Sequence, residues 1–112
     1  MKIAIPTANE KLCAHFGHCQ TFTMIAVDPA SKKITGAESL VPPEHAPGVY
    51  PKWLADQGAN VIIAGGMGGR AQQLFEQNGI KVVVGASGDD PKAIVQSYLD
   101  GKLTTGANLC DH

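Results

Sequence analysis

Two short, mainly apolar runs, residues 60–64 and 80–84, constrain the fold of this chain more than any other feature of the sequence. Neither run alternates between apolar and polar residues, which is typical of strands covered on both faces in a parallel sheet. A helical pattern over residues 69–77 separates the two runs, and Asp90 opens a second helix that reaches about residue 99. Strand, helix, strand and helix in this order predict βαβ crossovers, and therefore an α/β fold.

The first half of the chain adds three strands and one helix. Residues 21–27 and 34–41 are rich in strand formers and flank a turn with Asp28-Pro29, so they predict an antiparallel hairpin. The first strand is expected to stop at Pro6, and residues 7–20 are expected to form a polar, exposed loop. Three prolines within residues 42–47 predict a stiff loop. We therefore expect a mixed five-stranded central sheet with helices on both faces. The expected strands are 2–6, 21–27, 34–41, 60–64 and 80–84, and the expected helices are 49–57, 69–77 and 91–99.

Size and charge exclude several classes of protein. The chain has 112 residues, of which 44% are apolar, which is enough for one core and too few for two ordinary domains. We expect a single domain over residues 1–112. The formal charge of −1 comes without a basic stripe, which argues against a nucleic-acid partner. No apolar run approaches the roughly 18 residues of a membrane span, so we expect no membrane partner and a cytoplasmic location.

The large side chains allow a prediction of the core. Phe22, Trp53, Phe75 and Tyr98 are expected to be buried, because aromatic side chains contribute most to core packing. Tyr50 is expected to be half exposed, because it stands at the start of a helix.

The cysteines and histidines are strongly clustered. The chain has three Cys and four His, and six of these seven residues lie in residues 13–19 or in the last three positions. Thiolate and imidazole are the donors that bind thiophilic transition metals and metal-sulfur clusters. The sequence therefore predicts a site for a metal or cluster, with candidate ligands Cys13, His15, His18, Cys19, Cys110 and His112.

Other roles for these residues remain open. A disulfide between Cys13 and Cys19, or between Cys19 and Cys110, is the simplest alternative, although an odd number of cysteines cannot all pair internally. A second alternative makes the histidines hydrogen-bonding loop residues and the cysteines small buried side chains. A third is a thiol oxidoreductase with Cys13 or Cys19 as the reactive group. The donors do not match a regular zinc motif, since there is no Cys-x2-Cys pair.

A second motif, the glycine turn, consists of Gly65, Gly66, Met67, Gly68 and Gly69 and is followed by Arg70. It is expected between a strand and a helix, where free backbone N–H groups and the positive end of the helix dipole favour an anion such as a metal-sulfur cluster. Tight turn geometry alone is the alternative. Met67 is expected either to line a pocket or to be exposed.

The same turn resembles a dinucleotide fingerprint. It contains Gly66-x-Gly68-x-x-Ala71, and Asp89 or Asp90 follows at roughly the expected spacing. However, Asp90 is better placed to cap the next helix. The sequence lacks Gly-Lys-Ser/Thr, which excludes a P-loop. A nucleotide-binding or regulatory interaction module is therefore the alternative to metal binding.

The sequence does not predict an enzyme. Its carboxylates are dispersed along the chain, and the first strand carries none, so no set of acids for general acid–base or two-metal chemistry stands out.

Several of these segments together resemble the dinitrogenase iron-molybdenum cofactor biosynthesis family, which includes NifX-like proteins and the C-terminal region of NifB. The resemblance covers nearly the whole chain. Its carriers are the Met-Lys-Ile-Ala-Ile-Pro start, His15-Phe16-Gly17 before the hairpin strand, the glycine turn, and Val82-Val83-Val84-Gly85. It implies a ribonuclease H-like α/β fold without nuclease activity, and the binding or transfer of an iron-sulfur or iron-molybdenum type cluster. His15, Phe16, Gly17 and the glycine turn are the site residues that it implies.

Cys13, Cys19 and the terminal Cys110-Asp111-His112 look like features of a cysteine-rich branch of small stand-alone members, rather than of the family as a whole. Added thiolates favour an iron-sulfur cluster, or a single Zn, Fe or Cu ion, as the cargo. We expect the C-terminal tail to fold over the bound metal. The expected partners are a cluster donor or acceptor protein, and the chain is expected to be a monomer or weak dimer.

Overall fold

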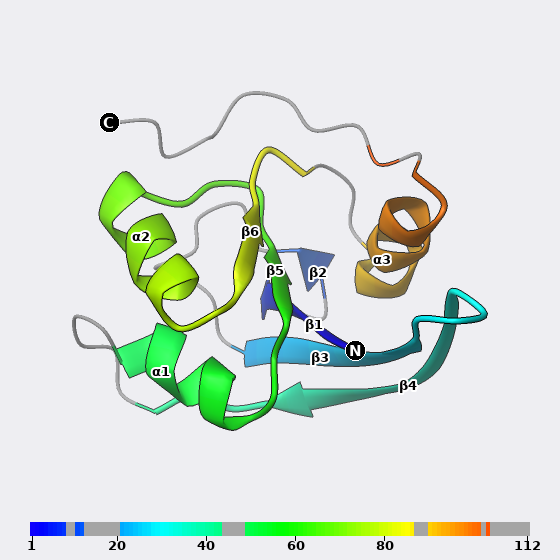
Figure 1. Cartoon of the computed structure of the whole chain (residues 1–112), viewed down its shortest axis with the longest axis horizontal. Coiled ribbons are helices and arrows are strands. Elements are labelled where there is room, and N and C mark those ends of the chain that lie inside the picture. The colour runs from blue at the N-terminus through cyan, green and yellow to red at the C-terminus, as the bar shows by residue number, and fades with distance from the viewer. Residues whose placement is uncertain (9–10, 13–20, 44–48, 87–89, 102, 104–112) are drawn as a thin grey trace.

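The computed structural model describes residues 1–8, 11–12, 21–43, 49–86, 90–101 and 103 (Figure 1). Its strands are β1 (Lys2–Ala8), β2 (Lys11–Leu12), β3 (Thr21–Asp28), β4 (Lys33–Leu40), β5 (Val61–Ile63) and β6 (Lys81–Val83). Its helices are α1 (Val49–Asp56), α2 (Gly69–Gln77) and α3 (Pro91–Leu99).

The main sheet follows the order β4-β3-β1-β5-β6, and β2 pairs with the end of β1. β1, β5 and β6 are parallel, whereas β3 is antiparallel to β1 and β4 is antiparallel to β3. This arrangement confirms the predicted α/β class, the mixed sheet and the β3–β4 hairpin.

The core consists of two apolar clusters, one on each face of the sheet. Alternation along β1 sends Ile3 and Ile5 into the cluster that α3 covers, and Ala4 into the cluster that α1 and α2 cover. β5 is buried on both faces, as its continuous apolar run predicts, because it lies in the middle of the parallel part of the sheet. Helices therefore cover both faces, as predicted (Figure 1).

The helix ends follow local sequence signals. α1 is followed by Gly58 with φ of +89°, and α2 by Asn78 and then Gly79 with φ of +79°. Asp90 caps α3 by accepting a hydrogen bond from the backbone N–H of Lys92 at 3.1 Å. The predicted cap of α3 by Asp90 is confirmed.

The prediction that the first strand stops at Pro6 is wrong, because β1 continues to Ala8. Met1 and Val27 exchange two backbone hydrogen bonds of 2.8 and 3.0 Å, so by alternation the missing N–H of Pro6 is on the side of β1 away from β3. β5 pairs with β1 only up to Ala4, and β2 begins to pair at Thr7. Pro6 therefore lies at a position of β1 where no neighbouring strand would accept a hydrogen bond from a backbone N–H. β2 itself lies inside the segment predicted to be a loop.

Two side-chain predictions also need correction. Tyr50 is only 6% exposed, because its ring packs edge-on against Phe22 with centroids 5.3 Å apart. Met67 is fully buried in the cluster with Phe75, so it neither lines an open pocket nor faces solvent. Phe22 and Phe75 are buried as predicted, whereas Trp53 and Tyr98 are partly buried against the two clusters.

Candidate functional site

The carboxyl ends of the three parallel strands meet at one edge of the sheet. β1 ends there at Ala8, β5 at Ile63 and β6 at Val83. The segment that follows each strand leaves from this edge, which is where ligands bind in open α/β sheets. Among the described residues, the glycine turn follows β5 and leads directly into α2 (Figure 1).

Backbone hydrogen bonds join the glycine turn and the residue before it to the segment after β6. The backbone N–H of Gly85 donates to the carbonyl of Gly65 at 3.1 Å, and the N–H of Ala86 donates to the carbonyl of Ala64 at 3.2 Å. Gly85 has φ of +81°, a conformation that favours glycine over every other residue. Gly65 and Gly66 are buried, so this half of the turn belongs to the scaffold.

The second half of the turn faces solvent. Gly68, Gly69 and Arg70 are exposed, and no side chain caps the start of α2. Gly68 has φ of −65°, and a Cβ at either Gly68 or Gly69 would meet nothing within 4 Å. Turn geometry therefore does not require these two glycines, and they leave bare backbone at the N-terminus of a helix.

The side chain of Met67 belongs to the core, although the residues that follow it in the turn are exposed. Its side chain is fully buried, and its carbonyl accepts a hydrogen bond from Nε2 of Gln72 at 2.9 Å. Gly68, Gly69 and Arg70 are thus exposed, whereas Gly65, Gly66 and Met67 are buried.

We call residues 13–20 the donor segment. The described residues on either side of it lie at the same edge of the sheet as the glycine turn. Leu12 and Thr21 both pair with Thr7, from its two sides. The predicted ligands and family-motif residues lie outside the described residues: Cys13, His15, Phe16, Gly17, His18, Cys19, Cys110 and His112. Within the described part of the chain, no three His, Cys, Asp or Glu residues gather where they could hold a metal ion.

A cluster of three threonine hydroxyls lies next to these flanks, and we call Thr7, Thr21 and Thr23 the threonine cluster. Thr7 is fully buried, and its Oγ1 is 2.7 Å from Oγ1 of Thr21, 3.2 Å from Oγ1 of Thr23 and 3.2 Å from the Thr21 carbonyl. Sequence reasoning missed this cluster, because Thr7 was assigned to a loop. The available signal was Thr21 and Thr23 at alternate positions of a predicted strand, with Thr7 directly after another predicted strand.

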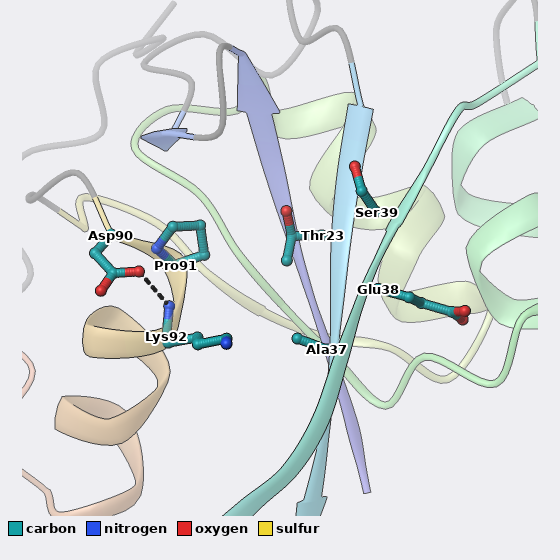
Figure 2. Close-up of a pocket in the computed structure, with 7 residues that line it drawn as sticks. All are labelled: Thr23, Ala37, Glu38, Ser39, Asp90, Pro91 and Lys92. Carbon is teal, nitrogen blue, oxygen red and sulfur yellow. Dashed lines mark hydrogen bonds between the residues drawn. The ribbon is translucent and has the colours of Figure 1, made fainter.

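A pocket of about 500 Å³ opens beside the threonine cluster, between β3, β4 and the start of α3 (Figure 2). Figure 2 shows Thr23 and Ser39 on the sheet wall, opposite Asp90 and Lys92. Asp90 is engaged as the cap of α3, which leaves it unsuited to the ribose contact of a dinucleotide fingerprint. The pocket is assembled from three distant segments, so no local pattern in the sequence indicates it.

The fold and this edge define a class of protein: a small mixed α/β domain with a glycine turn at the carboxyl edge of its parallel strands. The model of the dinitrogenase iron-molybdenum cofactor family matches residues 1–101, and the chain belongs to that family. The resemblance inferred from the sequence motifs is confirmed.

Known proteins resemble this chain over nearly its whole length. The protein MJ0580 of Methanocaldococcus jannaschii is 28% identical in an alignment of 109 residues that covers 92% of this chain and 89% of the relative. The crystal structure of PH0822 superposes with a TM-score of 0.85 at 27% identity, over 95% of this chain and 96% of the other. The apo form of the orange protein from Desulfovibrio gigas gives 0.73 at 27% identity, over 96% and 93% of the two chains.

Within the residues that the structure describes, no helix combines the length and the apolar character needed to cross a membrane.

Proposed function

We propose that this protein binds and carries a metal-sulfur cluster of the iron-sulfur or iron-molybdenum type, and passes it between a donor and an acceptor protein. Membership of the dinitrogenase iron-molybdenum cofactor family supports a role with such cargo. We also infer from the family motifs that the mixed sheet is of the ribonuclease H-like kind.

One observation carries the proposal more than any other. The flanks of the donor segment and the glycine turn lie at the same edge of the sheet, since Leu12 and Thr21 pair with the end of β1 and Gly68 follows the end of β5. The flanks of the donor segment and the glycine turn are far apart in the sequence and share one edge of the sheet. We propose that the thiolates and imidazoles of the donor segment meet the exposed backbone N–H groups of the turn there.

The proposed ligands divide into three kinds. The thiolates of Cys13, Cys19 and Cys110 and the imidazoles of His15, His18 and His112 coordinate the metal. The backbone at Gly68 and Gly69, with Arg70, stabilises the negative charge of the cluster. Phe16 and Gly17, carried over from the family motif, shape the donor segment.

The direct test uses the full chain, purified without oxygen and then incubated with ferrous iron and sulfide. We expect bound iron by elemental analysis and a visible absorption band, and we expect both to be lost in the Cys13→Ser/Cys19→Ser double variant. A wild-type protein that stays colourless and metal-free would overturn the proposal and favour an interaction module. Rapid alkylation of the cysteines in the loaded protein would favour a thiol oxidoreductase instead, because a bound metal shields its thiolates.

The glycine turn has its own test. Gly69→Ala adds a methyl group where the fold has room for it, so it should leave stability unchanged or raise it by about 0.5–1 kcal/mol. If the bare backbone faces the cluster, the same variant should lose bound iron. Full loading of Gly69→Ala would remove the glycine turn from the site.

Metal affinity should also depend on pH. Each ligand must lose its proton before it coordinates, so affinity should fall from about pH 8 to about pH 5 as the histidines become protonated. A competition titration with a chelator measures this, and a flat profile would contradict imidazole ligation.

A further inference from the structure

We propose that Thr7 is a positioning residue for the donor segment, and that its buried hydroxyl fixes the start of β3, the strand that follows residues 13–20, to the end of β1. This inference rests on the proposed function, since it concerns how the metal ligands are brought together.

The three contacts of Thr7 can all be hydrogen bonds at once in only one way. A hydroxyl has one proton and two lone pairs. If Thr7 donates to the carbonyl of Thr21 at 3.2 Å, its lone pairs accept from the hydroxyls of Thr21 at 2.7 Å and Thr23 at 3.2 Å. Thr7 is then fully satisfied although no part of it reaches water.

The position of Thr7 in the sheet gives this network its effect. Leu12 pairs with Thr7 on one side and Thr21 pairs with it on the other, so the ends of the donor segment are two strand spacings apart, or about 10 Å. Cys13 directly follows one flank, and Cys19 lies two residues before the other. Fixing the β3 flank to β1, with which β2 also pairs, lowers the conformational entropy that metal binding would otherwise have to remove from the segment.

The fold itself does not need a hydroxyl at this place. On the same face of β1, the preceding residues Ile3 and Ile5 are apolar and enter the cluster under α3. Valine has nearly the same shape as threonine and a similar preference for strands, so it would continue this apolar row. The hydroxyl instead links β1 to the strand that follows the donor segment.

The test compares three variants of the full chain. Thr7→Val removes the hydroxyl and keeps the shape, whereas Thr7→Ser keeps the hydroxyl. Ile25→Val is the matched control, because Ile25 is fully buried on the same face of β3 but makes no contact through a hydroxyl. Two quantities are measured: amide hydrogen exchange at the start of β3 in the metal-free protein, and the affinity for Zn²⁺ in competition with a chromophoric chelator.

We expect Thr7→Val to speed exchange at the start of β3 and to weaken Zn²⁺ binding by up to about tenfold, the smallest loss typical of removing an outer-shell partner, because Thr7 acts through the strand and not on a ligand itself. Thr7→Ser should keep wild-type exchange and wild-type Zn²⁺ affinity. Ile25→Val should change neither exchange nor affinity by more than about threefold. The rescue by serine separates a positioning role from a general loss of stability.

Each result decides the matter. Thr7→Val behaving like Ile25→Val in both measurements, or faster exchange with wild-type affinity, would overturn the positioning role. If the wild type bound neither Zn²⁺ nor a reconstituted cluster, the proposed function would fail. Amide exchange at the start of β3 would then show by itself whether the Thr7 hydroxyl fixes that strand to β1.

Discussion

Adjacent residues in the glycine turn have opposite roles. Met67 is fully buried among aromatic and aliphatic side chains, whereas Gly68 and Gly69 are exposed and have open space where a Cβ would stand. A core contact and a candidate ligand surface are thus only one residue apart. The reason is that the chain leaves the buried end of β5 and reaches solvent within this turn.

Truncation of Met67 should therefore act on stability. Met67→Ala removes a buried side chain from the cluster under α1 and α2, and we expect it to lower the free energy of unfolding by about 2–5 kcal/mol. Urea denaturation followed by circular dichroism measures this loss. Arg70→Ala, at an exposed position of the same turn, is the control and should change stability by less than about 0.5 kcal/mol.

At the scale of elements, the β3–β4 turn is organised by one carboxylate. Oδ1 of Asp28 accepts from the backbone N–H of Ala30 at 3.0 Å, and its carbonyl accepts from the N–H of Lys32 at 2.8 Å. The hydrogen bond from Ala30, followed by one from the side chain of Ser31, lowers the pKa of Asp28 below its ordinary value of 3.8.

This lowered pKa predicts the sign of a pH effect. The charged form of Asp28 stabilises the fold above its ordinary pKa, and that contribution is lost as the pH falls through the lower value of the folded state. Wild type should therefore be more stable than Asp28→Asn at about pH 6, and the difference should shrink at about pH 2.5. Denaturation of both proteins at the two pH values measures this. A difference that grows in acid would contradict the assignment.

At the scale of the molecule, the two apolar clusters share one sheet. Leu54 of α1 lies in one cluster and Ile94 of α3 in the other, while β1 and β5 contribute to both. Disruption on either face must therefore loosen the same strands, and the described part of the chain should unfold as one cooperative unit.

Leu54→Ala and Ile94→Ala test this coupling. Each should lower the free energy of unfolding by about 2–5 kcal/mol while leaving a single transition, because both helices depend on the same sheet. The double variant should be largely unfolded if the wild-type stability is near the lower end of the usual range of about 5–15 kcal/mol. Separate transitions seen by tryptophan fluorescence and by far-ultraviolet circular dichroism would show that the faces unfold independently.

Local sequence determined much of the fold. The capping Asp90, the glycines at positions 58 and 79 and the apolar run of β5 act through the conformation of a few neighbouring residues, so their effects follow from the sequence alone. The family motifs also indicated the class of protein before any coordinates, because they depend on residue type and spacing rather than on packing. The proposed metal ligands lie outside the described residues and remain predictions.

Tertiary structure decided what depends on a neighbouring strand or helix. Pro6 continues β1 only because no strand needs its N–H, and Tyr50 is buried only because Phe22 on β3 packs against it. The threonine cluster exists because β1 and β3 are paired in one register, which places Thr7 opposite Thr21. A shift of one residue in that register would move Thr7 away from its partner, and no short stretch of sequence specifies the register across two strands.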